Sequence, residues 1–382
     1  MNTPVGQDSP ARFILLTVIP QLSTLDWGRF LARPRLPSPP LRVLDALYRR
    51  PMLITGAAGS IGSALARRAA ALAPSALLLL DASESRLYGL QQDWAVNGLP
   101  GTFTAVLGTV NDRTLLDEAF SAHAPRLVFH AAAFKHVPLL EQQPIAAIAN
   151  NVFGTLSLAR AAKGHGATVV LLSTDKAVEP SSIMGATKRV SEQIVLATGG
   201  VVLRLGNVLA TRDSVAETFA RQIATGKPLT VTDPAARRYF LTVDEAVNML
   251  LIAASEADGP IMLAPELARP HFITDLAHFM AEELAPGREI EIDFIGTRPG
   301  DKESERFWSS TESPRPADEH GLLAIHSPIL TDAELETRLA ALRSAVDARD
   351  LAGALVELRA MVPDYAPSRE VQSLAGHRVS SS

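Results

Sequence analysis

A glycine-rich turn that joins a short apolar run to an alanine-rich segment constrains this chain more than any other feature. The run is Met52–Thr55, and Gly-Ala-Ala-Gly-Ser-Ile-Gly follows at positions 56–62. In such a strand–turn–helix unit the first glycine permits the tight turn, the second lets the backbone approach a pyrophosphate, and the third lets the helix pack on the strand. The pattern predicts a nucleotide-binding loop. Its predicted ligand contacts are Gly56, Ala58, Gly59, Ser60, Ile61 and Gly62.

Short apolar runs and helix-period segments alternate from residue 51 to residue 206. The strand candidates are 52–55, 76–81, 103–107, 127–130, 168–173 and 201–205, and the helix candidates are 64–72, 114–122, 150–163 and 187–198. Strands separated by helices of this length form right-handed crossovers and therefore a parallel sheet. We predict an α/β fold, in which a Rossmann-type doubly wound parallel sheet carries a smaller C-terminal substrate lobe.

The remaining segments divide into four predicted regions. Residues 1–50 form an N-terminal extension, whose proline cluster predicts an extended tether. The alternation stops after residue 206, and 207–330 is predicted as a mixed α/β substrate-binding lobe. Residues 331–366 are helical, and their apolar positions fit packing on the core or self-association, of which we favour packing. Residues 367–382 are polar and predicted to be a loose tail.

Composition excludes several classes of protein. The chain of 382 residues has no cysteine, so a disulfide framework, a thiolate metal site and a cysteine nucleophile are ruled out. We expect no metal. The net charge of −5 argues against nucleic-acid binding. The apolar stretch at 13–20 lacks a basic segment before it and is too short to cross a membrane. We therefore expect a cytoplasmic protein without a membrane span.

Asp81, at the end of the second predicted strand, bears on the choice of cofactor. A carboxylate about 20 residues beyond such a loop can bind the ribose hydroxyls of a dinucleotide and would repel a 2′-phosphate. We therefore expect NAD, with NADP less favoured because Ser83 and Arg86 lie nearby. Helix capping is the alternative role for Asp81.

A second polar cluster follows a later predicted strand. Ser173, Thr174, Asp175 and Lys176 come at its carboxyl end, where ligands bind in parallel α/β sheets, and Lys188 lies in the next predicted helix. A solvated ion pair is the structural alternative for the adjacent aspartate and lysine. The arrangement resembles the extended short-chain dehydrogenase/reductase superfamily, in which a tyrosine precedes such a lysine by four residues. Met184 occupies the tyrosine position here, and methionine cannot transfer a proton.

One branch of that superfamily fits the methionine. The chain resembles the polysaccharide-biosynthesis nucleotide-sugar 4,6-dehydratases, which act on UDP-N-acetylglucosamine, in a form without their N-terminal membrane domain. The similar blocks are S-T-D-K-A at 173–177, M-G-A-T-K-R at 184–189, H-A-A-A-F-K-H-V-P at 130–138, N-N-V-F-G-T at 150–155, L-G-N-V-L at 205–209, R-R-Y-F-L-T at 237–242 and R-P-G-D-K at 298–302.

The resemblance implies oxidation at carbon 4 by NAD, elimination of water across carbons 5 and 6, and return of the hydride to carbon 6. It makes the chain a lyase, with Asp175 as the acid, Lys176 as the base and Thr174 holding the 4-oxygen. Lys188 would bind the nicotinamide ribose, and Asn151 would steady this lysine through a water or backbone contact. For Lys176 to act as a base, its pKa must fall through burial or neighbouring cations.

Further contacts follow from the same resemblance. The expected cofactor-binding residues beyond the loop are Asp81, Ser83, Arg86, Thr109, Val110, Ala131, Ala132, Ala133, Asn151, Ser173 and Lys188. The expected contacts with the UDP-sugar are Lys135, His136, Asn207, Arg238 and Arg298. A homo-oligomer is implied as well.

Two other functions remain open. A nucleotide-sugar 4-epimerase or dehydrogenase of the same fold would not need the Asp175–Lys176 pair. A non-catalytic NAD-binding protein would explain Met184 but not the intact Thr174-Asp175-Lys176 set.

Overall fold

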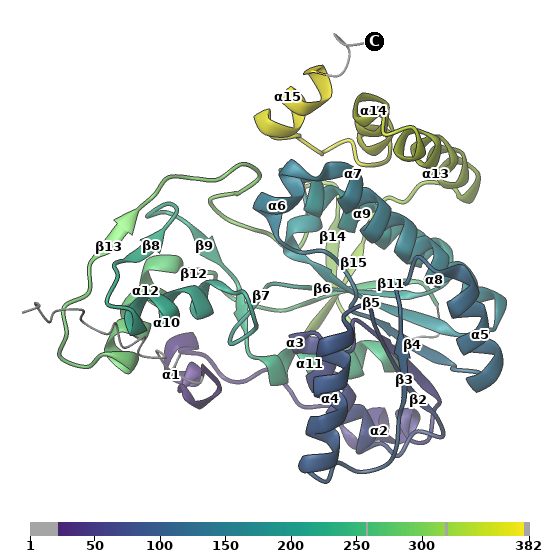
Figure 1. Ribbon diagram of the computed structural model, residues 1–382, viewed down its shortest axis with the longest axis horizontal. Coiled ribbons are helices and arrows are strands. Elements are labelled where there is room, and N and C mark those ends of the chain that lie inside the picture. Colours follow the sequence, from purple (N-terminus) through teal and green to yellow (C-terminus); the bar gives the residue numbers. More distant parts are fainter. Residues whose placement is uncertain (1–21, 257–258, 318–319, 378–382) are drawn as a thin grey trace, which may run out of the picture.

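A central, mostly parallel sheet organises the molecule (Figure 1). The computed structural model describes residues 22–256, 259–317 and 320–377. In strand order β14-β15-β11-β6-β5-β4-β1-β2-β3, this part of the chain forms a nine-stranded sheet. The parallel strands are β1 (Met52–Thr55), β2 (Leu77–Asp81), β3 (Thr104–Leu107), β4 (Leu127–His130), β5 (Thr168–Thr174), β6 (Val201–Leu205) and β11 (Ile261–Pro265), and the antiparallel ones are β14 (Ser313–Pro316) and β15 (Leu322–His326). The predicted Rossmann-type α/β class is confirmed.

The strand order reverses beside β1, where the predicted nucleotide loop begins. From β1 the chain continues to β2 and β3 on one side, then returns to β4 on the other. Thr55 is in register with Leu80 and with His130 across its two neighbours. In open parallel sheets a crevice forms outside the carboxyl ends of the strands at such a point. The predicted nucleotide loop begins there.

Helices cover both faces of the sheet. On one face lie α2 (Leu41–Leu47), α3 (Ser60–Ala70), α4 (Glu84–Val96) and α11 (Val243–Ser255), and on the other lie α5 (Arg113–His123), α8 (Gly154–Gly164) and α9 (Ile183–Ala197). Short turns, α6 (Val137–Gln142) and α7 (Pro144–Ala147), precede a π-helical segment, η2 (Ile148–Phe153). Burial of their apolar faces against the sheet supplies the main stabilisation of these helices. We call this part the sheet domain.

A second lobe lies beside the carboxyl ends of the sheet (Figure 1). It contains η1 (Leu22–Thr24), α1 (Trp27–Leu31), β7 (Asn207–Val208), α10 (Val215–Ala224), β8 (Leu229–Val231), β9 (Arg237–Arg238), β10 (Phe240–Leu241), β12 (His271–Phe272), α12 (Ile273–Leu284) and β13 (Ile292–Phe294). The prediction of one continuous lobe over 207–330 is wrong, because α11 packs on α3 and because β11, β14 and β15 belong to the central sheet.

The N-terminal segment is also more than a tether. Trp27 and Phe30 are buried in the second lobe, whereas Val43 and Leu47 are buried in the sheet domain. Residues 33–40 between them are not helical, as the prolines require. The prediction of an appendage is therefore wrong for residues 27–47, and residues 1–21 lie outside the described part.

Three helices end the described chain. α13 (Asp332–Asp347) and α14 (Leu351–Met361) pack with α9, α7 and η2 in one apolar cluster, so packing on the core is confirmed. The predicted loose tail is wrong over Arg369–His377, which forms α15 and buries Val371 in that cluster. Residues 378–382 lie outside the described part. None of the described helices combines the length and the apolar character needed to span a bilayer.

Candidate active site

The glycine-rich loop has a backbone that only glycine fits at two positions. Gly56 has a φ of 65°, and a Cβ there would lie 2.7 Å from Ala132 N. A Cβ on Gly62 would collide with Gly56 O. The loop therefore closes tightly between the end of β1 and the start of α3, against residues 131–132 that follow β4. Gly59 precedes α3 in an extended conformation, and the amides of Ser60 and Ile61 begin the helix.

Asp81 holds this loop from the end of β2. Its Oδ2 accepts a hydrogen bond from Ala58 N, and its Oδ1 accepts one from Ser83 N, each over 2.9 Å. The capping alternative does not apply, because Ser83 is the residue that precedes α4. Arg86 is exposed in the first turns of α4. Asp81 thus lies at the edge of the loop, where the sequence places a ribose-binding carboxylate.

The other predicted cofactor residues follow the neighbouring strands. Thr109 comes after β3, and its Oγ1 accepts a hydrogen bond from Asn111 N over 3.3 Å. Val110 is buried, and a Cβ on Gly154 would meet its side chain. Ala131, Ala132 and Ala133 follow β4 directly. All of them lie at the carboxyl edge of the sheet, and their contact with a cofactor stays a prediction.

Asn151 lies in the π-helical segment and contacts residues other than the expected lysine. Its Oδ1 accepts from Phe134 N over 2.8 Å, and its Nδ2 donates to Phe134 O and to Thr187 Oγ1, each over 3.1 Å. Thr187 adjoins Lys188, so Asn151 fixes the segment after β4 against α9. π-Helical turns of this kind are often found at functional sites.

Thr174, Asp175 and Lys176 form one hydrogen-bonded group at the end of β5. Asp175 Oδ1 accepts from Thr174 Oγ1 over 2.9 Å and from Lys176 Nζ over 3.0 Å. Lys176 Nζ also donates to Asn207 Oδ1 over 3.0 Å. Asp175 is completely buried, so the alternative of a solvated ion pair does not apply.

One oxygen of Asp175 accepts no hydrogen bond from the described residues. Oδ2 is buried and makes no hydrogen bond within the structure. Burial raises the pKa of Asp175, and the positive charge of Lys176 opposes this rise only in part. A proton on Oδ2 would remove the cost of a buried, unpaired oxygen charge. The geometry therefore favours a carboxyl group that can donate a proton.

Glu305 is a buried residue of this site that sequence reasoning missed. Its Oε2 lies 3.1 Å from Lys302 Nζ. Burial would raise its pKa, but the charges of Lys176, Lys302 and Arg238 outweigh burial and lower it. The negative charge of Glu305 in turn contributes to the raised pKa of Asp175. The buried carboxylate of Glu305 thus favours the protonated form of Asp175.

Lys188 and Met184 lie one turn apart on α9. Lys188 Nζ donates to Leu172 O over 2.8 Å, and only 6% of the residue is exposed. Burial lowers the pKa of Lys188 to about 8, partly opposed by the charge of Glu192. Met184 is buried as well, in the apolar cluster that α9 shares with α13 and α14.

Ser173 faces away from this group. Its Oγ donates to Glu192 Oε1 over 2.6 Å, so its hydroxyl is already committed to a buried carboxylate. Glu192 also pairs with Arg204, which pairs in turn with Glu312; both distances are 2.7 Å. The Ser173 hydroxyl therefore anchors β5 to α9, and its predicted contact with a cofactor stays a prediction.

Three of the five predicted substrate residues contact the sheet-domain site or the segment after β7. Asn207 meets Lys176, whereas Lys135 Nζ donates to Arg212 O over 2.7 Å, and His136 lies 3.7 Å from Asp213.

The two predicted substrate arginines differ in how their guanidinium groups are engaged. Arg238 is buried, and its guanidinium donates to the carbonyl oxygens of Arg237, Lys302 and Glu303. It therefore fixes the segment after β13. Arg298 is half exposed in an ion pair with Asp301, and no contact brings it to the other four.

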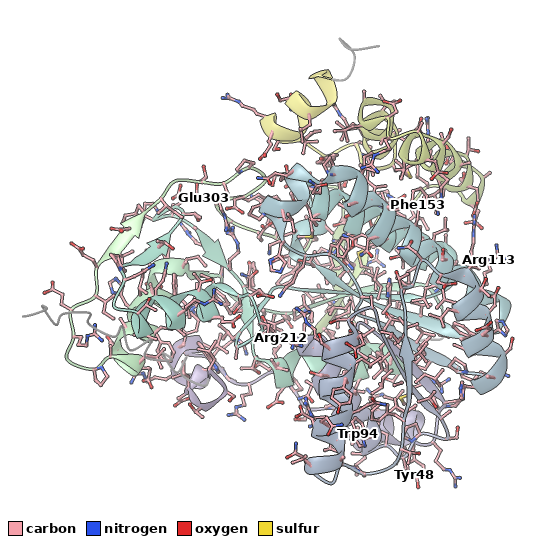
Figure 2. All side chains as sticks on the ribbon, viewed as in Figure 1. Tyr48, Trp94, Arg113, Phe153, Arg212 and Glu303 are labelled. Carbon is pink, nitrogen blue, oxygen red and sulfur yellow. The ribbon has the colours of Figure 1, made fainter. Side chains whose placement is uncertain are left out.

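That segment, residues 296–305, lies over the group at β5. Lys302 Nζ donates to Val178 O over 2.7 Å, and Ser181 Oγ donates to Gly300 O over 2.8 Å. Glu303 marks its course at the upper border of the second lobe in Figure 2. Lys302 and Glu305 thus enter the site from a region of irregular backbone, for which the sequence offers no periodic signal.

The fold and the site define a Rossmann-type α/β protein of the extended short-chain dehydrogenase/reductase kind. The model of the family described as polysaccharide biosynthesis protein matches residues 52–326. The chain belongs to this family.

Two relatives are similar to this chain over most of its length. The chain is 39% identical over 276 residues to the capsular polysaccharide biosynthesis protein CapD of Staphylococcus aureus, a match that covers 70% of this chain and 46% of CapD. It therefore spans about half the length of that relative. It is 34% identical over 282 residues to a UDP-glucose 4-epimerase of Rickettsia canadensis, covering 70% of this chain and 80% of the epimerase.

Solved structures share the fold. Pen from Bacillus thuringiensis aligns with a TM-score of 0.67 at 26% identity, over 74% of this chain and 89% of that one. A Thermus thermophilus UDP-glucose 4-epimerase in complex with NAD aligns with a TM-score of 0.58 at 22% identity, over 66% and 89%.

Proposed function

We propose that the chain is an NAD-dependent nucleotide-sugar 4,6-dehydratase, which converts UDP-N-acetylglucosamine to a UDP-4-keto-6-deoxy sugar and water. The observation that carries the proposal is the buried Asp175–Lys176 pair at the end of β5, with one oxygen of Asp175 unpaired. An elimination needs an acid and a base next to each other, whereas an epimerisation needs neither at this position. The names of the relatives agree with nucleotide-sugar chemistry in polysaccharide biosynthesis.

The loop after β1 fits a dinucleotide. The glycine loop leaves its backbone open to a pyrophosphate, because Cβ atoms are missing at Gly56, Gly59 and Gly62, and the N-terminus of α3 offers amide donors. Asp81 stands where a ribose would be bound and would repel a 2′-phosphate, which favours NAD over NADP. The solved neighbour with NAD supports the same choice. When bound, NAD would accept a hydride from carbon 4 of the sugar and return it to carbon 6.

The residues around the sugar would manage the protons. Thr174, whose Oγ1 donates to Asp175, would accept a hydrogen bond from the 4-hydroxyl, and water would carry away the proton that this hydroxyl loses on oxidation, so that Asp175 keeps its own proton for the next step. A ketone at carbon 4 makes the proton on carbon 5 acidic, and Lys176 would remove it. Asp175, whose pKa is raised, would give a proton to the hydroxyl that leaves carbon 6 as water. Met184 takes no part in proton transfer.

Other residues would bind and orient. Lys188 would hold the nicotinamide ribose through its ammonium group. Asn207, which positions Lys176, would also meet the substrate. Lys135 and His136 would approach the sugar, while Arg298 would meet the diphosphate after a movement of its segment. We further propose a homo-oligomer in the cytoplasm.

Proton NMR of the purified protein with UDP-N-acetylglucosamine in deuterated water tests the proposal. We expect loss of the hydroxymethyl signals of carbon 6, a new methyl group and deuterium at carbon 5. The ring couplings of the product would report whether carbon 5 is inverted. An unchanged substrate, with NAD bound to the protein, would overturn the proposal for this sugar.

A second candidate is a 4-epimerase, favoured by the Rickettsia canadensis relative. The same spectra separate the two reactions. An epimerase would keep the hydroxymethyl signals and change only the coupling at carbon 4.

A further inference from the structure

Arg212 reaches from the second lobe into the glycine-rich loop. Its guanidinium donates to Ala58 O, and its backbone N–H donates to Ser60 Oγ over 3.0 Å. Figure 2 labels Arg212 at the junction between the lobe and the sheet domain. Ala58 and Ser60 belong to the loop that we propose holds NAD, whereas Arg212 follows β7. The two parts of the molecule therefore meet at the proposed cofactor site.

The guanidinium of Arg212 makes no close carboxylate contact within the described part of the chain. Among the described residues, its guanidinium takes part in no ion pair. It stands beside the N-terminus of α3, where helix amides carry a partial positive charge. A cation in this position is unfavourable unless an anion lies between the two.

Two more cations surround the same place. Lys135 Nζ donates to Arg212 O, and Arg86 lies close enough to act on Lys135. Burial lowers the pKa of Lys135; the charges of Asp213 and Glu217 oppose this change, whereas those of Arg212 and Arg86 add to it. Arg212 thus brings a cation to an amide-rich loop, and a guanidinium together with backbone amides is suited to a doubly charged anion.

The backbone around Arg212 is held in an uncommon conformation. Ala210 has a φ of 57° and Asp213 a φ of 58°, which residues with a Cβ rarely adopt. Such conformations persist where surrounding contacts impose them, and they are concentrated at binding sites. Here Thr211 Oγ1 donates to Val208 O over 2.9 Å, and Asp213 lies 3.7 Å from His136. The segment 210–213 is therefore fixed so that Arg212 points at the loop.

We propose that Arg212 binds the diphosphate of NAD, so that a residue of the second lobe completes the cofactor site of the sheet domain. This inference rests on the proposed function. A guanidinium presents five donors in a planar fork, so one edge can stay on Ala58 O while another donates to a phosphoryl oxygen. The lobe then contributes to the retention of NAD and not only to the recognition of the sugar.

Calorimetric titration of NAD into protein freed of nucleotide tests this inference without reference to turnover. We expect Arg212→Ala to weaken NAD binding by about tenfold, the usual effect of losing one charge-assisted hydrogen bond. Arg212→Gln keeps a donor for Ala58 O without the charge and should bind NAD as weakly. Arg221→Ala is the matched control, because Arg221 is an exposed arginine of the same lobe, 3.9 Å from Glu217 on α10. It should bind NAD within twofold of the unchanged protein.

The outcomes separate the two proposals. If the unchanged protein binds NAD and both Arg212 variants weaken binding by less than threefold, the inference about Arg212 is wrong while the proposed cofactor stands. If the unchanged protein does not bind NAD, the proposed function itself fails. Added salt should weaken NAD binding to the unchanged protein more than to Arg212→Gln, because an exposed ion pair is screened. Equal salt dependence would contradict the diphosphate contact. Circular dichroism of each variant establishes that it is folded.

Discussion

Asp175 and Lys176 are adjacent in sequence, but they differ in burial and in hydrogen bonding, and these differences suit them to different roles. Asp175 is buried with one unpaired oxygen, whereas the side chain of Lys176 is 23% exposed and bonds to Asn207 across the mouth of the site. Glu305 adds a negative charge that favours a protonated Asp175. A proton donor and an amine next to each other are what an elimination of water requires, and no phenol is needed for that step.

Asp175→Asn should abolish the elimination. The amide keeps the shape of the side chain but cannot give a proton to the leaving hydroxyl, so we expect kcat to fall by about 10²–10⁴-fold. Uptake of hydride from carbon 4 does not need this proton, and the near-ultraviolet absorbance of reduced nicotinamide should accumulate. The control is Asp117→Asn, an exposed residue of α5. Turnover of Asp175→Asn within threefold of the unchanged enzyme would remove Asp175 from the role of acid.

Activity should fall as the pH rises above about 8. Lys188 has its pKa lowered by burial to about 8, so it is charged below that pH and neutral above it. The proposed binding of the nicotinamide ribose uses the charged form. The pH profile of kcat/KM reports the ionisation of groups in the free enzyme, and it should show this decline above about pH 8. The matched variant is Lys188→Arg, whose guanidinium stays charged, and its remaining activity should not decline between about pH 8 and 10. If Lys188→Arg shows a decline of the same shape, the decline above about pH 8 belongs to another group.

The residues of the site were predictable where they follow strands. Thr174, Asp175, Lys176 and Asn207 come at the ends of β5 and β6, and parallel strands bring their carboxyl ends to one edge. Glu305 was not predictable, because it reaches the site from irregular backbone after β13. Its burial and its charge become evident only from the tertiary contacts with Lys302 and Lys176.

At the scale of elements, a buried charge network joins β5, β6 and α9 to the segment before β14. Arg204 on β6 bonds to Glu192 on α9 and to Glu312, and Arg189 lies 3.0 Å from both carboxylates. Ser173, next to Thr174, donates to Glu192. The network therefore fixes the end of β5, from which the proposed acid and base project.

Arg204→Met should destabilise the fold strongly. It leaves Glu192 and Glu312 buried with only Arg189 to balance them, which costs about 3–5 kcal/mol of the free energy of unfolding. Urea denaturation at pH 7 measures this loss. Arg160→Met removes an exposed pair with Glu336 and should cost less than about 1 kcal/mol.

Neutralising Glu192 and Glu312 tests whether their unpaired charges cause the loss of stability in Arg204→Met. The triple variant Arg204→Met, Glu192→Gln, Glu312→Gln should recover part of the stability lost in Arg204→Met, because no unpaired carboxylate remains buried. If Arg204→Met costs no more than Arg160→Met, the network does not hold this region together.

The individual strands of the sheet domain were easier to predict than the division of the strands between the central sheet and the second lobe. Each predicted strand from 52–55 to 201–205 is present, since apolar runs between helix-period segments leave few alternatives. The return of β11 and β15 to the central sheet was missed, because residues 261–265 and 322–326 lack a regular alternation with helices. The π-helical turn at Ile148–Phe153 has no sequence signal distinct from that of an α-helix.

At the scale of the whole molecule, the segment 27–47 ties the second lobe to the sheet domain. Arg33 donates to Glu245 Oε1 over 2.7 Å and to Oε2 over 3.0 Å, and Glu245 lies in the first turn of α11. The side chain of Glu245 is 3% exposed and also accepts from Leu36 N. The proline cluster between the two ends keeps the connection extended. Trp27 is buried in the core of the second lobe, and Leu47 is buried in the core of the sheet domain. A movement of the lobe relative to the sheet domain would therefore strain the ion pair between Arg33 and Glu245.

Arg33→Met should therefore weaken the connection and change how stability depends on pH. Burial raises the pKa of Glu245, but the bonds from Arg33, Leu36 and Thr242 outweigh burial and lower it. A carboxylate whose pKa is lower in the folded state stabilises the fold above its unfolded pKa, and this stabilisation is lost as the pH falls through the folded pKa. Without Arg33, the pKa of Glu245 in the folded protein rises toward or above its value in the unfolded chain. The loss of stability that protonation of Glu245 causes at low pH should therefore disappear. At pH 7 the variant should lose about 3 kcal/mol, because Glu245 stays buried without its partner.

The matched control is Arg29→Met. Arg29 lies on the same segment and pairs with Glu282 and Glu283, but its own side chain is 53% exposed. We expect a loss below about 1 kcal/mol and an unchanged dependence on pH. Urea denaturation at pH 7 and at pH 4 measures both quantities. Equal losses in the two variants would mean that the lobe is held by its apolar contacts with Trp27 and Phe30, and that the buried pair adds nothing to them.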